Sequence, residues 1–432
     1  MGHETRLPSN LAEEQLVDAL ADAAPAPPPT SEVGRAGHVV LAASLVLIAF
    51  NLRPLFSSLS VVLPEVMRDT GVSALGASLM TTLPVVCLGI FAPLAARLAM
   101  RLGAERVIAA LLLVLGLGTA LRGLGTMPAL LLGSAMAGAS IAIVTVLMPG
   151  LVKRDFPERA AAMTGLYTMA LCGGAAAGAG LTVPIEDRLG GAWWVALAAW
   201  SLPALLTAAI WAPQALATRH GESRSAYRVN GLWSDPLAWQ LTLFMGLQSA
   251  LAYCVFGWLA PILRERGLDP VTAGFVVSVS IVFQTFACLV MPSIAVRGRD
   301  QRAINVGLIV LSVGSLLACL VAPLAGVWIY AALLGVAQGG LISVILTLII
   351  LRSPDARVAA HLSGMAQGVG YVLAATGPLL VGYIRASTGD FRACGVLFIA
   401  VGTLAAVNGL GAGRALHVRA RAVPVDERRP VA

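Results

Sequence analysis

The sequence has 432 residues, of which 58% are hydrophobic and only 12% are charged, with a formal net charge of +7. A soluble domain carries roughly a quarter charged residues, and a soluble fold could not keep so much apolar surface from water. The composition therefore excludes a soluble enzyme and indicates an integral membrane protein with several spans.

The six cysteines lie singly in apolar segments, without C-x-x-C or metal-ligand spacing. We interpret them as small buried hydrophobic residues, and we predict no cofactor and no metal. Residues 1–37 contain six acids and the run AAPAPPPT, a composition typical of a disordered tail. Because a signal peptide would begin with basic residues, we expect the first span to serve as an uncleaved targeting signal.

A spanning helix needs about 20 mostly apolar residues. In chain order, the first six predicted spans are residues 39–63, 73–98, 104–125, 127–151, 160–184 and 192–212. The next six are residues 237–262, 271–296, 303–322, 326–351, 358–383 and 392–412. We therefore predict an all-α integral membrane protein with two six-helix bundles, 38–212 and 237–412. A central loop, 213–236, joins the bundles, and a tail, 413–432, follows them.

Basic residues are unevenly divided between the two sides of these predicted spans. With the N-terminus in the cytoplasm, 21 of the 29 Lys and Arg residues fall on the cytoplasmic side and six on the other, leaving Arg53 and Arg122 within spans. Cytoplasmic loops carry an excess of Lys and Arg, so we predict that both termini are cytoplasmic. The positive net charge reflects this orientation and gives no indication of nucleic-acid binding.

The two bundles resemble each other in sequence. LPEVMRDTGVSALGA, which ends the first span, parallels APILRERGLDPVTAG, which ends the seventh. MTGLYTMALCGGAAAGAG matches LSGMAQGVGYVLAATGPL without gaps, pairing Gly165 with Gly364 and Gly178 with Gly377. Six-helix halves repeated in the same direction occur in transporters whose site lies between the halves at mid-membrane.

Four stretches between about residue 45 and residue 395 carry a family resemblance: NLRPLFSSLSVVLPE, TTLPVVCLG, AIVTVLMPGLVKRDFPERAAAMTGLY and SGMAQGVGYVLAATGPLLVGYI. Through them the chain resembles the major facilitator superfamily and, within it, the cyanate and 2-nitroimidazole permeases. The N-x-R-P of the first span is the most specific motif. Ala96, Ser134 and Ala179 stand where superfamily patterns have Asp, Arg and Pro. The resemblance implies the twelve-helix fold and leaves the mode of energy coupling open.

Arg53 lies about 14 residues into the first span, or about 21 Å at 1.5 Å per residue. A charge near the bilayer centre costs about 3 kcal/mol or more, and the sequence places no acid at that depth. The guanidinium could be satisfied within the protein, by carbonyl groups freed at Pro54, or by snorkelling outward to the membrane surface. Alternatively, it binds an anionic or strongly dipolar ligand, which suits its planar fork. We favour the ligand and predict Arg53 as the substrate anchor. Arg122, at the outer end of the third span, is expected to snorkel.

Other polar residues within the spans are candidates for substrate binding. Asn51 could line the same cavity or lock the helix break, and such side chains also join helices at about 0.6 kcal/mol per contact. Gln367 and Tyr371 share a helix face, and Tyr167 aligns in the repeat with Ala366, which favours cavity lining for that trio. The full set is Asn51, Tyr167, Gln248, Tyr253, Gln284, Gln338, Gln367 and Tyr371.

Secondary transport is the function we predict. There is no Walker A pattern, so ATP does not drive transport directly. A membrane-embedded enzyme would need catalytic groups at depth, and a non-transporting receptor would need more than the 24-residue central loop. We predict a monomeric carrier, facilitative or secondary active, in the bacterial inner membrane. Its substrate is a small anionic or dipolar organic solute, cyanate-like or nitroimidazole-like as the resemblance implies.

A drug or metabolite efflux antiporter of the same fold is the alternative. A proton-coupled carrier usually holds a titratable carboxylate inside the bundle, and the sequence places none there. We therefore expect a facilitator, or a symporter whose proton travels on the substrate rather than on a dedicated internal acid.

Overall fold

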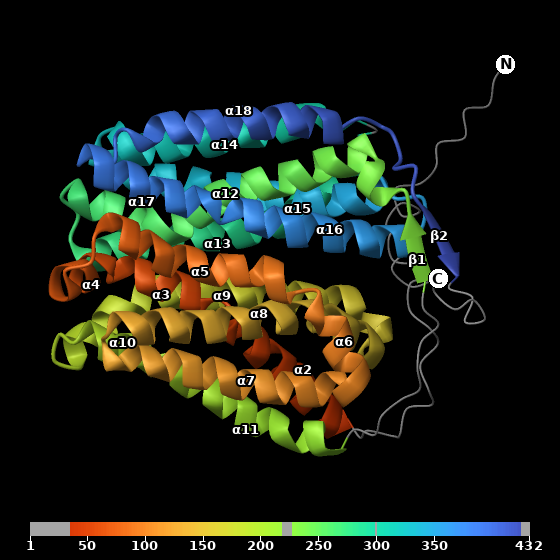
Figure 1. The fold of residues 1–432 in the computed structure, drawn as a ribbon, viewed down its shortest axis with the longest axis horizontal. Helices are drawn as coiled ribbons and strands as arrows, with labels where there is room; N and C mark the ends of the chain where they lie inside the picture. Colours follow the sequence, from red (N-terminus) through yellow and green to blue (C-terminus); the bar gives the residue numbers. More distant parts are fainter. Residues whose placement is uncertain (1–34, 218–226, 299, 425–432) are drawn as a thin grey trace, which may run out of the picture.

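The computed structural model describes residues 35–217, 227–298 and 300–424, which are almost entirely helical (Figure 1). The first group of helices is α2 (Arg35–Asn51), α3 (Pro54–Val61), α4 (Leu63–Thr70), α5 (Ala74–Phe91), α6 (Leu94–Leu102), α7 (Ala104–Leu121), α8 (Met127–Asp155), α9 (Ala160–Arg188), α10 (Trp193–Ala199) and α11 (Ser201–Ala217). The second is α12 (Pro236–Glu265), α13 (Pro270–Ala295), α14 (Arg302–Val321), α15 (Val327–Leu351), α16 (Ala356–Ala374), α17 (Thr376–Thr388) and α18 (Cys394–Ala412). Shorter elements are the 3-10 turns η1 (Arg122–Leu124), η2 (Pro157–Arg159), η3 (Leu232–Ser234) and η4 (Leu324–Gly326), and the strands β1 (Tyr227–Asn230) and β2 (Arg421–Pro424).

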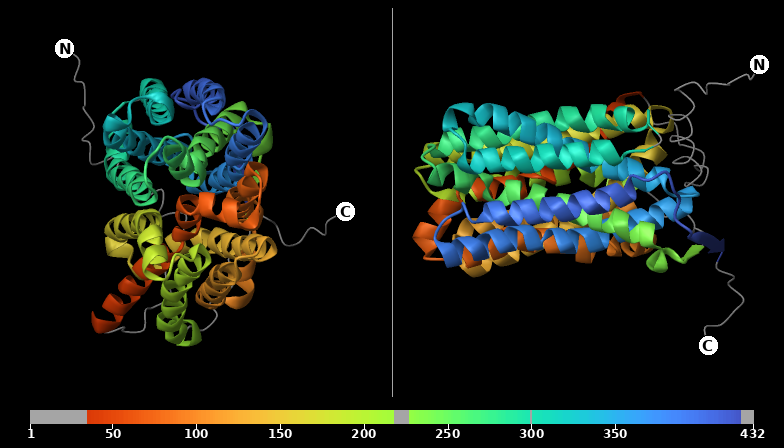
Figure 2. Two further views of the ribbon diagram at one scale, coloured as in Figure 1. Left: turned by 90° about the vertical axis from the view of Figure 1, so that its left-hand side faces the viewer. Right: turned by 90° about the horizontal axis from the view of Figure 1, so that it is seen from above.

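The described residues contain 12 segments long and apolar enough to cross a membrane, which confirms the twelve predicted spans. Elements α2–α11 form one bundle, here called the N-half, and α12–α18 form the other, the C-half (Figure 1). Seen end-on, the helices separate into these two groups (Figure 2). The end of the molecule that holds β1 and β2 is called the termini end, and the opposite end, with α4 and α10, is the loop end. The predicted two-bundle membrane fold is therefore present.

The first span, predicted over residues 39–63, is broken beside Pro54, where the sequence indicates a helix break. α2 ends at Asn51 and α3 begins at Pro54. Proline has no amide hydrogen, and the first helical position is where that donor is not needed. Arg53 occupies the cap position before Pro54, without a side-chain cap of its own. The break therefore falls at the arginine that the sequence singles out.

The two halves approach closely near the loop end, and also where Gly89 of α5 meets the backbone of Gly368 of α16. A Cβ atom added to Gly274 of α13 would lie 2.5 Å from the carbonyl oxygen of Ala179 of α9. One added to Gly382 of α17 would lie 2.3 Å from Cβ of Ser78 of α5. Backbones this close exclude any side chain larger than glycine's, as is common where membrane helices pack.

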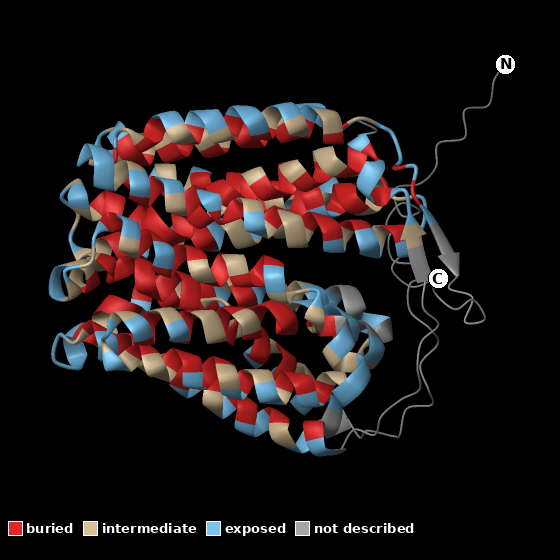
Figure 3. Ribbon diagram, viewed as in Figure 1, coloured by how far each residue is buried: buried red, intermediate tan, exposed pale blue. Residues whose placement is uncertain are grey.

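The contact between the halves loosens toward the termini end. A Cβ atom added to Gly165 of α9 would find its nearest neighbour, Leu289 of α13, at 4.0 Å, and one added to Gly364 of α16 would meet nothing within 4 Å. Buried residues gather inside each bundle and where the bundles meet, and exposed residues cover the outer faces (Figure 3). The halves are thus closed against each other at the loop end.

A C-terminal strap, residues 413–424, returns across the termini end of the C-half. Within it, the Val418 amide donates a 2.8 Å hydrogen bond to the Arg352 carbonyl oxygen, and the Arg419 amide donates one of 2.8 Å to the Asp235 carboxylate. Strand β2 then pairs antiparallel with β1. The strap ties the connection between the halves to the C-half.

The strands β1 and β2 change the predicted boundaries of the central loop and of the C-terminal tail. The predicted central loop, 213–236, contains the end of α11 and the strand β1, and the predicted tail, 413–432, contains β2. Short strands of this kind have no apolar periodicity, so the sequence did not indicate them. Most of the predicted disordered tail 1–37, together with residues 218–226 and 425–432, lies outside the described residues.

We expect Asp235→Ala to lower the free energy of unfolding by about 2 kcal/mol. Asp235 caps α12 through hydrogen bonds of 2.8 and 3.0 Å to the Leu237 and Ala238 amides, and it also accepts the bond from the strap. Asp355→Ala is the matched control, because Asp355 caps α16 through two similar bonds and, among the described residues, accepts none from the strap. Thermal unfolding gives the comparison, and equal losses would show that the strap contact contributes nothing.

Candidate functional site

Arg53 stands half-buried at the break between α2 and α3. Its guanidinium carbon lies 6.0 Å from the ring centroid of Phe56, one turn further along α3. Arg53 forms no ion pair with any residue that the structure describes. Within a membrane span such a charge needs compensation from a partner or a ligand.

Three tyrosines act electrostatically on the Arg53 guanidinium: Tyr253 of α12, Tyr371 of α16 and Tyr167 of α9. The Tyr253 ring lies 6.2 Å from the Tyr371 ring, nearly perpendicular to it, and 5.7 Å from the Phe56 ring. Tyr167 comes from the N-half and the other two tyrosines from the C-half. The structure thus brings four predicted residues, the arginine and three tyrosines, to one place between the halves.

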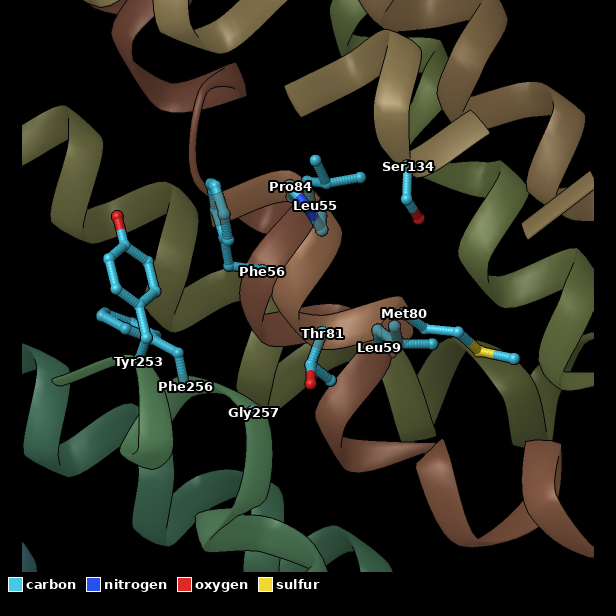
Figure 4. Close-up of a pocket in the computed structure, with 10 residues that line it drawn as sticks. All are labelled: Leu55, Phe56, Leu59, Met80, Thr81, Pro84, Ser134, Tyr253, Phe256 and Gly257. Carbon is cyan, nitrogen blue, oxygen red and sulfur yellow. The ribbon is translucent and has the colours of Figure 1, made fainter. Parts of the chain in front are cut away.

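A small cavity adjoins this group (Figure 4). Its volume is about 10 Å³, room for about one water molecule. Phe56 and Tyr253 belong both to the cavity wall and to the surroundings of Arg53. The full lining is Leu55, Phe56, Leu59, Met80, Thr81, Pro84, Ser134, Tyr253, Phe256 and Gly257. An organic solute can enter only if the halves or these side chains move.

Two other predicted residues, Asn51 and Gln338, join helices within one half, and a third, Gln248, bonds only within its own helix among the described residues. The Asn51 amide donates hydrogen bonds to the Pro203 carbonyl oxygen (3.3 Å) and to the Thr207 hydroxyl (2.9 Å), which ties α2 to α11. Gln338 donates one of 2.8 Å to Ser312, which ties α15 to α14. Gln248 donates one of 2.8 Å to the neighbouring Ser249. For Asn51 and Gln338 the contacts favour helix joining over cavity lining.

The remaining two predicted residues, Gln367 and Gln284, are half-buried. Gln367 donates a 2.9 Å hydrogen bond to Ser363, one turn earlier on α16. Gln284 lies where α13 crosses α15, since a Cβ atom added to Gly339 would be 2.1 Å from its carbonyl oxygen. Within the described part of the chain, neither glutamine is hydrogen-bonded to Arg53. Of the trio favoured from the repeat, the two tyrosines interact electrostatically with Arg53, and Gln367 bonds to its own helix.

The snorkelling predicted for Arg122 is wrong. Its side chain is 0% exposed, and none of its three guanidinium nitrogens has a hydrogen-bond partner among the described residues. Gly133 of α8 explains how the side chain enters the bundle, because a Cβ atom there would lie 3.1 Å from Cγ of Arg122. The absent side chain leaves room for the arginine stem, a detail that span boundaries do not reveal.

Sequence reasoning missed two residues at the site. Phe56 follows Arg53 by three positions, the spacing that places two side chains on one helix face, and this signal was available. Cys172 of α9 also acts electrostatically on the guanidinium. Nothing in the sequence around Cys172 distinguishes it from the other five cysteines.

Asn51→Ala is expected to lower the free energy of unfolding by about 1–2 kcal/mol, because it removes hydrogen bonds between α2 and α11. Transport per folded molecule should stay within about twofold of the unsubstituted protein, since a loss below about 0.5 kcal/mol corresponds to that factor. Thermal unfolding and uptake in proteoliposomes measure the two effects. Lost uptake at unchanged stability would place Asn51 in the substrate site.

The sequence model of the protein family described as Major Facilitator Superfamily matches residues 40–378. The protein named Uncharacterized transporter YycB, from Bacillus subtilis (strain 168), is 36% identical over 381 residues, which cover 88% of this chain and 94% of the relative. The 2-nitroimidazole transporter of Escherichia coli (strain K12) is 35% identical, covering 88% and 97%. The cyanate transport protein CynX of the same strain is 30% identical, covering 80% and 90%.

Solved structures with low sequence identity share the architecture. A mutant of the nucleoside transporter NupG superposes with a TM-score of 0.69 at 13% identity, covering 86% of this chain and 99% of that chain. The D-xylose-proton symporter gives a TM-score of 0.68 at 14% identity, covering 89% and 98%. At this identity the likeness shows the fold alone.

Proposed function

Because the chain belongs to the Major Facilitator Superfamily, as its sequence motifs predicted, we propose that it carries a small anionic or strongly dipolar organic solute across the bacterial cytoplasmic membrane. The protein is a multi-pass membrane transporter with twelve spans. It acts as a monomer by alternating access, with its substrate site between the halves.

The observation that carries this proposal is the unpaired Arg53. Its charge lies within a span, next to side chains of both halves, and no carboxylate of a described residue forms an ion pair with it. The planar guanidinium fork recognises carboxylate-like groups through two parallel hydrogen bonds. An anionic or dipolar solute would supply the missing negative end, and the rings of Phe56 and Tyr253 would pack against its body.

The names of two relatives support this substrate class. One is named a 2-nitroimidazole transporter and the other a cyanate transport protein. Cyanate is an anion, and a nitro group presents two partly negative oxygens in the geometry that an arginine fork accepts. A solute carrying such a group, small enough for a site between Arg53 and the tyrosines, is the substrate that we propose.

The closed loop end supports an inward-facing state. Loops at the termini end carry most of the basic residues, which by the distribution of Lys and Arg puts that end in the cytoplasm. The tight approaches at Gly274 and Gly382 then seal the outer side, and the looser contact at Gly165 lies on the cytoplasmic side. Rocking of the halves around Arg53 would expose the site to each side in turn.

Arg53→Ala should reduce uptake of the substrate to the background of empty proteoliposomes while leaving the amount of protein in the membrane unchanged. Loss of a charge-assisted pair costs about 2 kcal/mol or more, or about 30-fold in binding. Arg53→Lys should restore little, because an ammonium group lacks the fork. Uptake of labelled 2-nitroimidazole and of cyanate measures the effect, with Arg385→Ala, an arginine at the loop end, as the control. Normal uptake by Arg53→Ala would remove the anchor role.

Tyr167→Phe and Tyr371→Phe should weaken binding of the same probe by about three- to tenfold, since each removes one hydroxyl near the guanidinium. Expression should be unaffected because the rings, and therefore the packing, remain. The stabilisation of each variant by a fixed concentration of probe, measured by thermal shift, gives the comparison. Tyr330→Phe, on α15 and outside the group, is the matched control. Equal ligand-induced shifts in all variants would assign the two tyrosines to helix packing.

A further inference from the structure

One ionic contact joins the halves at the loop end. Of the ion pairs between described residues, only that of Glu65 on α4 with Arg264 on α12 crosses from one half to the other. Arg264 donates hydrogen bonds to both carboxylate oxygens, of which Nη1 to Oε2 is 2.6 Å, and a further bond of 2.9 Å to the Val61 carbonyl oxygen. The side chains of the pair are only 14% and 16% exposed. Opening the loop end requires this contact to break.

A second carboxylate lies beside this pair. Glu186, in the last turn of α9, interacts electrostatically with both Glu65 and Arg264. Glu186 is 7% exposed and forms no ion pair with a described residue. Two carboxylates of the N-half therefore face one guanidinium of the C-half. We call these three residues the loop-end gate.

The other charged groups of the N-half near the gate are exposed and lie toward water. Asp187 and Arg68 also act on Glu186, and both are exposed. Arg68 is bonded to Asp69 at 3.0 Å, and the Trp193 indole donates to the same carboxylate at 3.0 Å. These two hydrogen bonds hold the pKa of Asp69 below its usual range, so Asp69 stays ionised.

Neighbouring groups of the C-half are also engaged. Glu265 pairs with Arg385 at 2.9 Å, and Arg266 donates a 2.8 Å hydrogen bond to the carbonyl oxygen of Cys319. Helices α10 and α13, which pack against α9, contain no Asp, Glu, Lys, Arg or His. No further counter-charge therefore reaches the gate from the elements described around it.

The gate carries one negative charge in excess, since two carboxylates share one guanidinium. An uncompensated charge in a largely buried cluster is unfavourable, and a proton on one carboxylate both removes the excess and supplies a hydrogen-bond donor. We infer that the closed gate binds one proton, on Glu186, the carboxylate that has no ion pair with a described residue. The inference rests on the proposed transport function and places a proton on the protein, whereas the sequence favoured a facilitator or a symporter whose proton travels on the substrate.

When the gate opens, the excess negative charge is no longer buried, so the proton is no longer favoured there. Arg264 then separates from the carboxylates, and all three groups enter water, where an unneutralised carboxylate is well solvated. The closed gate therefore binds one proton more than the open gate. Acidification favours closure, and raising the pH favours opening, by up to tenfold in the open-to-closed ratio per pH unit for a single proton.

Distance measurements by pulsed electron resonance test the inference. Spin-labelled noncanonical residues replace Ser73 and Ser387, exposed positions at the loop end on opposite halves, in the full-length protein in nanodiscs. The open fraction is expected to rise as the pH increases from about 5 to about 9, by no more than tenfold per unit. Glu186→Gln, which mimics the protonated carboxyl, should stay closed throughout that range.

Glu265→Gln, the control from the adjacent C-half ion pair, should keep the pH dependence of the unsubstituted protein. If Glu186→Gln does not fold, Glu186→Asn serves instead and should also lose the pH dependence. An open fraction that does not change with pH, or that changes as before in a folded Gln or Asn variant, overturns the inference. The curve is measured without solute and reports the gate alone, so failure of the gate and failure of the proposed substrate site are told apart.

Discussion

A guanidinium inside a membrane span cannot remain without a counter-charge, and the arrangement around Arg53 follows from this constraint. Pro54 interrupts the first span and leaves the arginine at the break, half-buried, rather than in a continuous helix. The surrounding tyrosines offer polar hydroxyls and ring edges but no full negative charge. A carboxylate at this depth would neutralise the arginine and leave it no reason to bind a solute. This incomplete compensation is the reason for which we propose that the site binds a solute.

In the transport cycle that we propose, the two halves move against each other, and both halves contribute residues around Arg53. Arg53 belongs to the N-half, whereas Tyr253 and Tyr371 belong to the C-half, so a solute that touches all three bridges the moving parts. A ligand shifts a conformational equilibrium only by the difference in its affinity for the two states. The cavity of about 10 Å³ that shares Phe56 and Tyr253 with this group is too small for an organic solute, so a solute could occupy it only after movement.

The sequence predicted what depends on hydrophobic length and on charge, namely the twelve spans and the choice of Arg53. It could not predict which way a side chain points around its helix. Asn51, two residues from Arg53, turns to α11, and Arg122 points into the bundle because Gly133 leaves room for it. Glu186 looked like an ordinary helix-end acid until the packing of α4, α9 and α12 placed it beside an ion pair. Contacts between distant segments decided each of these outcomes.

The role of Arg53 as the substrate anchor is tested most directly by a structure of the protein in lipid with a bound solute. Electron cryomicroscopy in the presence of 2-nitroimidazole would provide it. The account predicts density for the nitro group within hydrogen-bond distance, about 3 Å, of the Arg53 guanidinium nitrogens, with the ring against Phe56 and Tyr253. Bound solute elsewhere in the molecule, with Arg53 instead hydrogen-bonded to carbonyl groups of the broken first span, would contradict it.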